Sequence, residues 1–550
     1  MLRRHGWALL AFAALTLLLT WPLPIRAATH QLGGGVDPWL FIWTVGWNAH
    51  ALTHAPLAIF DANIFYPHGN TLAYSEHLIG TALVAAPVIW VTGNPLLATN
   101  LAAAASVFLC AAGGYFLGRR LGFSRSAAFL CGLIFAFTPP RFGRIYQLHL
   151  TTIYCVPFAL GFLHTYLQNG RARDLRWAAA MFTLQALTSG HGTALLLLGG
   201  ALMIVHRVAT GWRIHLMRRV RDLGITGVLL LTPVALVFAR YWRARAEVGL
   251  VRELDDVGVT ASSWLATTSR VDTSLLSLLP DWIWLRTPPD VVLFPGVLVL
   301  LLAAAGAGAW RRSSVVWLFL PMLLLTIWMA IGPPFGVWQW IYWVPGLSFI
   351  RVPSRFMLLG MLALAVLAAA GFERIRARLP RRAQPAALAL AAGLLTAEFA
   401  TMPLDLRLQH IAPYAIDRWL DTLPKPFSIV EIPVPQSSLK TLVARRHAEY
   451  MLHSMAHFQP LVQGYSGIEP PGFVDVELAL MRFPDEASLD LLERMKVTYA
   501  VVHMDYFPPE LIEYATAGLE RFEREGRLRL VHSEGHGRVY ALRGELPNAH

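Results

Sequence analysis

One carboxylate near the start of the chain lies in a setting suited to acid–base chemistry. Asp37 belongs to the segment GGGVDPW and is followed by tryptophans at positions 39, 43 and 47. A carboxylate beside indole rings is partly desolvated, which suits it to accept a proton from a hydroxyl. An Asp–Pro pair is also typical of a helix start, where Asp37 would cap a helix beginning at Pro38 and the tryptophans would form an interfacial belt. The two interpretations are compatible, because a capping aspartate can still face a cleft.

The opening loop, residues 33–77, ends on two further candidate catalytic residues. Glu76 and His77 stand where the polar loop gives way to an apolar stretch. We expect them on the far wall of a cleft whose near wall carries Asp37. Alternatively, they begin a helix, with the acid in the first turn, where the helix dipole favours negative charge.

Arginines and histidines next to apolar runs form a second group of candidates. An arginine close to lipid is costly unless it is paired, and phosphate is a fitting partner because the guanidinium forks onto it. An ordinary salt bridge is the alternative, and a lone histidine at such a place is more typically a hydrogen-bonded interfacial residue. Together with two polar residues inside the opening loop, the candidate substrate-binding residues are Arg351, Arg355, Arg141, Arg144, His149, His191, Asp61 and Tyr66.

Other patterns carry weaker signals. Ser437 and Lys440 have S-x-x-K spacing without its companion motifs, and the turn GYSG at 464–467 lacks the spacing of a nucleophile elbow. His453 and His457 lie four residues apart, yet no H-E-x-x-H accompanies them, so a packed helix face is the better interpretation. The three cysteines fall inside apolar runs and are expected as small buried hydrophobes. The sequence thus predicts no cofactor and names no metal ligand, and it leaves dependence on a divalent metal open.

The elements that must position these residues are membrane helices. Of the 550 residues, 55% are hydrophobic and only 15% are charged, and several apolar runs approach the length that crosses a bilayer. We expect a polytopic α-helical membrane protein with about eleven spans. The predicted spans are residues 6–25, 94–117, 124–139, 148–167, 177–189, 192–209, 223–239, 291–309, 315–331, 354–371 and 386–402.

Arginine placement orients this bundle. Suppose that the apolar stretch 78–93 lies on or dips into the membrane surface and does not cross it. The connectors between spans on one side of the membrane then hold about 20 arginines and three acidic residues. This asymmetry predicts a cytoplasmic N-terminus and an extracytoplasmic C-terminus. It also explains the formal net charge of +12 without a nucleic-acid partner. The first run could be a secretory signal peptide, but Arg26 and the neighbouring prolines make its cleavage site poor.

The predicted domains are a transmembrane bundle, residues 1–403, and an extracytoplasmic α/β domain, residues 404–550. The bundle includes an extracytoplasmic catalytic loop at 26–93. The C-terminal segment holds 20 of the 34 acids and all three lysines. Within it we expect strands at 427–434 and 497–504, helices at 488–496 and 509–525, and a closing hairpin at 528–542.

This arrangement resembles the GT-C superfamily of integral-membrane glycosyltransferases, and in particular its bacterial branch. The resemblance rests on GVDPWLFIW, FDANIFYPHGNTLAYSEH, GNPLLATNL and FIRVPSRF, and it covers roughly residues 1–400. It implies a GT-C-like bundle in a bacterial inner membrane and a polyprenyl-phosphate-linked sugar as donor. It further implies that the first-loop acid, here Asp37, acts as general base, and that Glu76 matches a second acid late in the loop. The adjacent acidic pair found in some members is absent, because Pro38 follows Asp37, which puts metal dependence in doubt.

The expected reaction is transfer of a hexose or pentose, with inversion, to a hydroxyl of a cell-envelope glycan, lipid or protein. Asp37 would accept the proton, and Arg351 and Arg355 would stabilise the leaving lipid phosphate. The cleft is expected between the opening loop, residues 332–355 and the C-terminal domain. A transporter or flippase is the competing class, but it predicts charges at the bilayer midplane, where Glu398 is the one clear candidate. A non-catalytic assembly factor for envelope polymers is the third.

Overall fold

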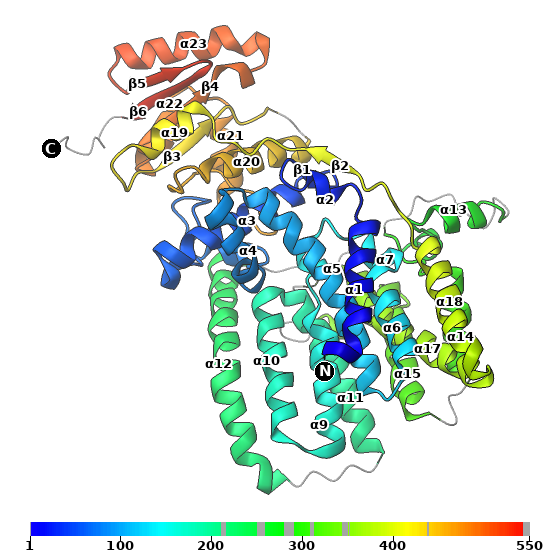
Figure 1. Ribbon diagram of the computed structural model, residues 1–550. Helices are drawn as coiled ribbons and strands as arrows, with labels where there is room; N and C mark the ends of the chain where they lie inside the picture. Colours follow the sequence, from blue (N-terminus) through cyan, green and yellow to red (C-terminus); the bar gives the residue numbers. More distant parts are fainter. Residues whose placement is uncertain are drawn as a thin grey trace. The chain divides into compact units, whose positions relative to one another are not determined.

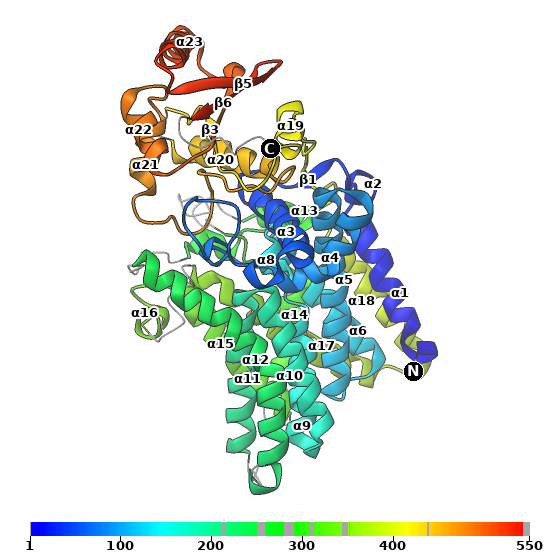
Figure 2. The same ribbon diagram turned by 90° about the vertical axis from the view of Figure 1, so that its left-hand side faces the viewer.

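The computed structural model describes residues 2–210, 216–249, 259–279, 291–308, 313–343, 350, 352–436 and 439–542 (Figures 1 and 2). By their contacts the residues group into two units. The helical unit comprises Met1–Ala28, Asn100–Val237 and Val251–Leu406, and the sheet unit comprises Thr29–Thr99, Phe238–Leu250 and Arg407–His550. The opening loop, which we expected within the bundle, is therefore grouped with the C-terminal segment. The predicted division at residue 403 lies close to the last boundary, at Leu406.

The helical unit is built from apolar helices, and each of the eleven predicted spans overlaps one. Five segments are long and apolar enough to cross a membrane: Pro95–Arg120, Leu148–Asn169, Gly190–Ala209, Ser314–Ile331 and Pro353–Arg378. This confirms a polytopic helical chain, while the number of crossings and their orientation stay predictions. The longer helices are α1 (Leu2–Leu19), α5 (Pro95–Arg120), α6 (Arg125–Phe137), α9 (Cys155–Asn169), α10 (Ala172–Thr188), α11 (Gly190–Ala209), α12 (Leu216–Val248), α14 (Val297–Ala307), α15 (Ser314–Ile331), α17 (Met357–Arg378) and α18 (Gln384–Glu398). The short ones are α2 (Leu23–Arg26), α7 (Pro139–Phe142), α8 (Leu148–Thr151), α13 (Arg270–Leu276) and α16 (Trp338–Ile341).

Helix α17 is the centre of this unit. Its residues from Met357 to Phe372 are all buried, and it packs against α6, α14 and α15. Two glycines allow α14 and α17 to approach closely, since a Cβ at Gly371 would lie 1.9 Å from the carbonyl oxygen of Leu302 and one at Gly306 would lie 2.0 Å from that of Leu367. Small residues at such a crossing are typical of helices that pack in a membrane.

Helix α4 (Ile79–Thr92) belongs to the sheet unit and packs against α3 (Asp37–His54). Its 14 residues extend about 21 Å, which is shorter than the roughly 30 Å hydrocarbon core. Leu83, Val84, Trp90 and Val91 are nevertheless exposed on it. That residues 78–93 lie on or dip into the membrane surface stays a prediction.

The C-terminal part of the sheet unit is the predicted α/β domain. Its four-stranded sheet has the order β3-β4-β6-β5, with β3 parallel to β4 and the other pairs antiparallel. The predicted strands, both helices and the hairpin are all found. The elements are β3 (Ile429–Ile432), β4 (Tyr499–His503), β5 (Leu528–Glu534), β6 (Gly537–Leu542), α19 (Ala415–Asp421), α20 (Lys440–Ser454), α21 (Phe473–Leu480), α22 (Glu486–Arg494) and α23 (Pro509–Arg524).

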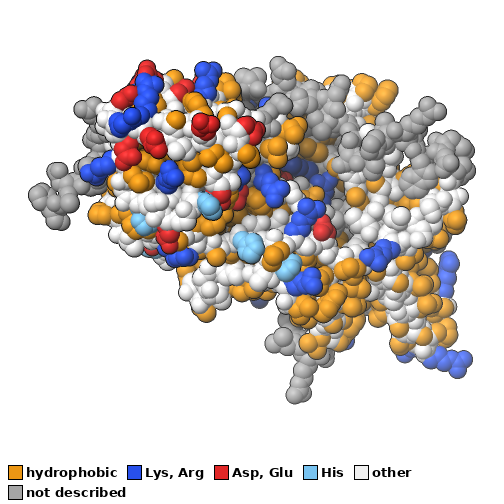
Figure 3. Space-filling view, turned by 90° about the horizontal axis from the view of Figure 1, so that it is seen from above, with side chains coloured by type: hydrophobic (Ala, Val, Ile, Leu, Met, Phe, Trp, Pro, Cys, Tyr) orange, Lys and Arg blue, Asp and Glu red, His pale blue; other side chains and the backbone are white. Residues whose placement is uncertain are grey.

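The core of this domain follows from strand alternation. Val430 and Ile432 of β3 pack in one cluster with Ala500 and Val502 of β4, together with apolar residues of α22 and α23. Glu431 therefore points to the opposite face. On the outer surface, acidic and basic side chains are interspersed (Figure 3), as expected for a domain that faces water.

The opening loop is joined to this domain by backbone hydrogen bonds. The Tyr66 N–H donates to the carbonyl oxygen of Leu461 at 2.9 Å, and the Leu461 N–H donates to that of Asn63 at 2.9 Å. The next residue, Val462, pairs with Ile429 of β3. Just before the loop, β1 (His30–Leu32) pairs with β2 (Leu406–Leu408). The loop is thus an ordered part of the sheet unit.

Candidate active site around Asp37

Asp37 is the first residue of α3, and its side chain does not cap that helix. The N-cap is Val36, which makes no side-chain cap hydrogen bond. The half-buried carboxylate instead accepts a hydrogen bond from the Tyr465 hydroxyl at its Oδ1, at 2.9 Å. Among the described residues it forms no ion pair. The capping interpretation is therefore wrong, while the position in the first turn still lets the helix dipole favour the negative charge.

Tyr465 is the residue that sequence reasoning missed. It lies in the GYSG turn, which we had discounted, and it is 428 residues from its partner. Burial, and then the charge of Asp37, raise the pKa of Tyr465 above its usual value, so its hydroxyl remains a donor. Its backbone N–H points at the sulfur of Met451 on α20, at 3.1 Å. Gly464 leaves room for the Phe65 ring of the opening loop, which a Cβ would meet at 2.7 Å.

The three tryptophans after Asp37 are buried, so the interfacial-belt interpretation is also wrong. Trp43 donates its Nε1–H to Asn63 Oδ1 at 3.2 Å, and Trp47 donates to the carbonyl oxygen of Ile59 at 2.9 Å. Trp39 packs beneath Arg445 of α20, whose guanidinium carbon lies 5.4 Å from a Trp39 ring centroid. The tryptophans fix α3 against the rest of the sheet unit, and this fixes Asp37 at the helix start.

His77 is fully buried and holds the end of the opening loop. Its Nδ1 lies 2.9 Å from the Tyr241 hydroxyl, which in turn donates to the carbonyl oxygen of Ser75 at 2.7 Å. Its own carbonyl oxygen accepts from Asn48 of α3 at 2.7 Å. A direct catalytic role does not fit this burial, and the geometry makes His77 a residue that positions the loop.

Glu76 is half-buried beside His77, outside any helix. Helix α4 begins only at Ile79, and its N-cap, Leu78, has a φ of 49°. Glu76 therefore precedes the first turn, and the alternative of an acid stabilised by the helix dipole is wrong. Its proposed role toward substrate stays a prediction.

Asp61 and Tyr66 shape the middle of the loop. Asp61 is exposed, and its Oδ1 accepts from the Asn70 N–H at 2.9 Å, which closes the turn between them. Tyr66 is partly buried against the core of the α/β domain. Both side chains serve the fold of the loop, and a contact with substrate stays a prediction for each.

In the helical unit, three predicted binding residues come together. Arg355 Nη1 lies 2.6 Å from His191 Nε2, and the His191 and His149 ring centroids are 5.2 Å apart. Arg355 precedes α17, and His191 lies in the first turn of α11. A guanidinium beside an imidazole can donate N–H groups to an anion. Arg351 lies outside the described residues.

Arg141 and Arg144 have different surroundings, although the sequence treats them alike. Arg141 is fully buried and donates to the carbonyl oxygens of Ala136 at 2.7 Å and Thr151 at 3.0 Å. It therefore ties α6 to α8, and its proposed contact with a phosphate stays a prediction. Arg144 donates to Gln147 at 3.3 Å, and its Nη2 is buried without a partner in the described part of the chain. Burial lowers the pKa of Arg144, which makes an anionic partner favourable there.

The structure gathers no metal-ligand set among the residues it describes. The discounted histidine pair does not share a helix face: His453 stacks on Tyr414 at 3.9 Å between ring centroids, and His457 lies beyond the end of α20. Lys440 begins α20, whereas Ser437 lies outside the described residues. The cysteines are buried and unpaired, as predicted.

Comparison with solved structures identifies the fold. No family model matches the sequence, and no curated protein matches it. The arabinofuranosyltransferase AftD from Mycobacteria is similar in structure over 99% of this chain and 40% of its own, with a TM-score of 0.58 and 14% identity. The oligosaccharyltransferase of Archaeoglobus fulgidus, in complex with Zn and sulfate, is similar over 90% of this chain and 68% of its own, with a TM-score of 0.51 and 15% identity. The chain therefore has the fold of the GT-C membrane glycosyltransferases, as the resemblance of its sequence motifs predicted.

Proposed function

We propose that this protein is a membrane glycosyltransferase that moves a sugar from a polyprenyl-phosphate donor to an acceptor hydroxyl. The acceptor is a cell-envelope glycan, lipid or protein at the outer face of a bacterial inner membrane. The observation that carries the proposal is the state of Asp37 at the start of α3. Its half-buried carboxylate forms no ion pair among the described residues and accepts a hydrogen bond from Tyr465, in a chain with a GT-C fold.

Asp37 is the proposed general base. Tyr465 occupies Oδ1, and this orients the carboxylate so that Oδ2 remains for the acceptor hydroxyl. The hydroxyl gives its proton to Oδ2 as its oxygen attacks the anomeric carbon from the face opposite the phosphate. The bond from that carbon to the phosphate oxygen breaks, and its electron pair leaves with the lipid phosphate. Attack and departure on opposite faces give inversion of configuration.

Cationic side chains are proposed to neutralise the leaving phosphate. Arg355 beside His191 is one, and Arg144, with a buried nitrogen that lacks a partner in the described residues, is another. Both present guanidinium N–H groups suited to phosphate oxygens. Arg351, which lies outside the described residues, keeps the same proposed role because it directly precedes a predicted span.

The test is transfer from a radiolabelled polyprenyl-phosphate sugar by the full chain in proteoliposomes. Asp37→Asn keeps the size of the side chain and removes the base, so we expect transfer to fall by a factor of about 10² to 10⁴. Circular dichroism and the thermal unfolding midpoint serve as folding controls. Full transfer by a folded Asp37→Asn variant would refute the base, and donor movement across the bilayer without transfer would favour a transporter.

A further inference from the structure

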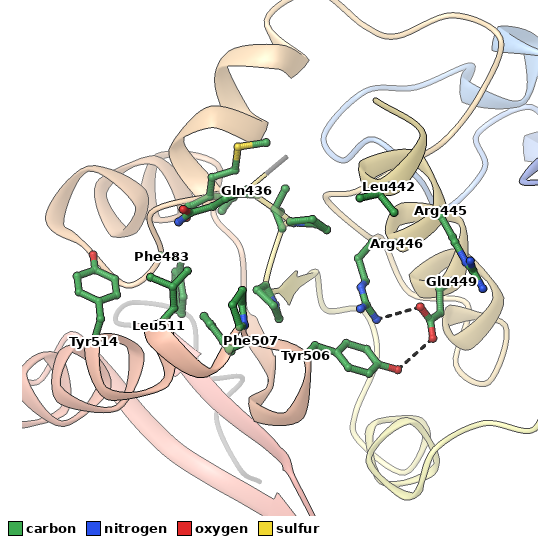
Figure 4. A pocket seen from close by; sticks show the side chains of 16 residues that line it. Gln436, Leu442, Arg445, Arg446, Glu449, Phe483, Tyr506, Phe507, Leu511 and Tyr514 are labelled. Atoms are coloured by element: carbon green, nitrogen blue, oxygen red, sulfur yellow. Dashed lines mark hydrogen bonds and ion pairs between the residues drawn. The ribbon is translucent and has the colours of Figure 1, made fainter. Parts of the chain in front are cut away.

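The sheet unit contains a pocket that the proposed chemistry does not use. Its volume is about 630 Å³, and it lies between α20, the segment that follows β3, and α23 with the loop before it (Figure 4). Pockets of about 300–1,000 Å³ are typical of small-molecule sites. Its lining combines charged, aromatic and apolar side chains, which come from parts of the C-terminal domain that are far apart in sequence.

One wall of the pocket is a fixed polar cluster. Arg446 donates to Glu449 Oε2 at 2.9 Å, and the Tyr506 hydroxyl donates to Glu449 Oε1 at 3.0 Å. The Arg446 guanidinium also stacks on Tyr506, 3.6 Å from the ring centroid. In the described part of the chain, Nη1 is the one nitrogen of Arg446 that is hydrogen-bonded, so further N–H groups remain for a ligand. Both carboxylate oxygens of Glu449 are engaged, which leaves the wall unsuited to a cationic ligand.

The facing wall is aromatic. Phe483 and Phe507 are buried, while Tyr514 of α23 is 46% exposed. The Tyr514 hydroxyl donates to the carbonyl oxygen of Arg482 at 2.8 Å, which anchors the ring at the rim. Figure 4 shows Tyr514 across the pocket from Arg446 and Tyr506. A wall that supplies an aromatic face and a wall that supplies hydrogen bonds suit a ligand that is apolar on one side and rich in hydroxyls on the other.

We propose that this pocket binds sugar residues of a glycan acceptor. A sugar ring packs its C–H groups on an aromatic face and directs its hydroxyls to guanidinium and phenol groups. A lipid chain would leave the polar wall unsatisfied, and the two arginines of the lining, Arg445 and Arg446, favour neutral or acidic sugars over basic groups. The inference rests on the proposed function, because that function requires an acceptor.

Helix α20 links this pocket to Asp37 within the same unit. Arg445 lines the pocket and lies over Trp39, two residues after Asp37. Farther along α20, Met451 accepts the N–H of Tyr465, the residue that holds Asp37. A glycan anchored along α20 would therefore lie on the helix that supports the proposed base.

The test is ligand binding by the purified full chain in nanodiscs, without donor. Saturation-transfer NMR would compare a neutral hexose trisaccharide, a uronate-containing trisaccharide and a proline-containing tripeptide. We expect binding of a trisaccharide, weakened about three- to tenfold by Tyr514→Ala and about tenfold or more by Arg446→Ala. Tyr514→Phe keeps the ring and should keep binding. Arg521→Ala, which removes an exposed arginine of α23 outside the pocket, is the matched control.

The outcomes separate this inference from the proposed function. Trisaccharide binding that depends on Tyr514, in a protein that shows no transfer, supports the pocket and contradicts the transferase. Transfer whose acceptor KM is unchanged by Tyr514→Ala and Arg446→Ala contradicts the pocket and supports the transferase. Binding of the tripeptide alone overturns the glycan assignment. Because Tyr514 lies at the exposed rim, its variant tests the pocket even if Arg446→Ala fails to fold.

Discussion

Removal of a single hydroxyl, in Tyr465→Phe, tests whether Tyr465 positions the proposed base. The hydroxyl donates to Asp37 at 2.9 Å, and hydrogen bonds to charged groups contribute about 1.5–3 kcal/mol. Asp37 is only half-buried, so water can replace part of this interaction and the lower end of the range applies. The effect on kcat comes from misplacement of the carboxylate, and a transition state raised by about 1.5 kcal/mol relative to the ground state corresponds to a roughly tenfold lower kcat.

The expected kinetic pattern is specific to positioning. The acceptor KM should change little, because the lost hydrogen bond orients the base and does not contact the acceptor. Tyr414→Phe, which removes a hydroxyl that contacts Tyr506 at 2.6 Å, is the matched control and should leave kcat unchanged. The assay is transfer in proteoliposomes at varied acceptor concentration, with the thermal unfolding midpoint of each variant. An unchanged kcat in a folded Tyr465→Phe variant would show that the tyrosine does not position Asp37.

Two further predictions concern stability. Glu431 and His503 form a buried pair at 2.6 Å on the face of the sheet away from its main core, so Glu431→Ala should cost on the order of 3–5 kcal/mol, measured by urea unfolding in detergent. Burial lowers the pKa of His503, but the charge of Glu431 outweighs it, and the pKa is raised above its usual 6.5. The stabilisation that protonated His503 contributes is therefore fully present below pH 6.5 and is lost as the pH rises through the raised pKa of His503. His503→Gln should remove the part of this pH dependence that comes from the imidazole and leave the part that comes from Glu431, whose pKa burial raises, and a curve of unchanged shape would contradict the reasoning. Gly371→Ala places a methyl group 1.9 Å from the Leu302 oxygen, so we expect about 1–3 kcal/mol of destabilisation and a lower yield of monodisperse protein, whereas wild-type yield would contradict the close crossing.

Local patterns predicted most of the secondary structure. Apolar runs of membrane length became helices because backbone polar groups in lipid must be satisfied within the segment, and that requirement depends only on local sequence. Strand alternation identified β3 and β4, and amphipathic periodicity identified α22 and α23, for the same reason. The resemblance of the opening-loop motifs added the GT-C fold.

The candidate site was predicted in part. Composition and spacing singled out Asp37, but they could not distinguish a capping aspartate from one that faces a tyrosine. The sequence also ranked Arg141 and Arg144 together, whereas Arg141 donates through both terminal nitrogens to backbone carbonyls and Arg144 donates through one nitrogen to the Gln147 side chain. Such differences depend on which groups surround a side chain, and those groups come from distant segments.

The sequence by itself determined that this is a helical membrane chain with a charged C-terminal α/β domain and a carboxylate at the start of its opening loop. Only the tertiary structure decided that this loop belongs with the C-terminal domain, through hydrogen bonds near residues 63–66 and 461–463. It also decided that Tyr465 meets Asp37, across 428 residues of sequence. Periodicity and composition are local properties, whereas the partner of a side chain is fixed by packing between segments, for which no local pattern exists.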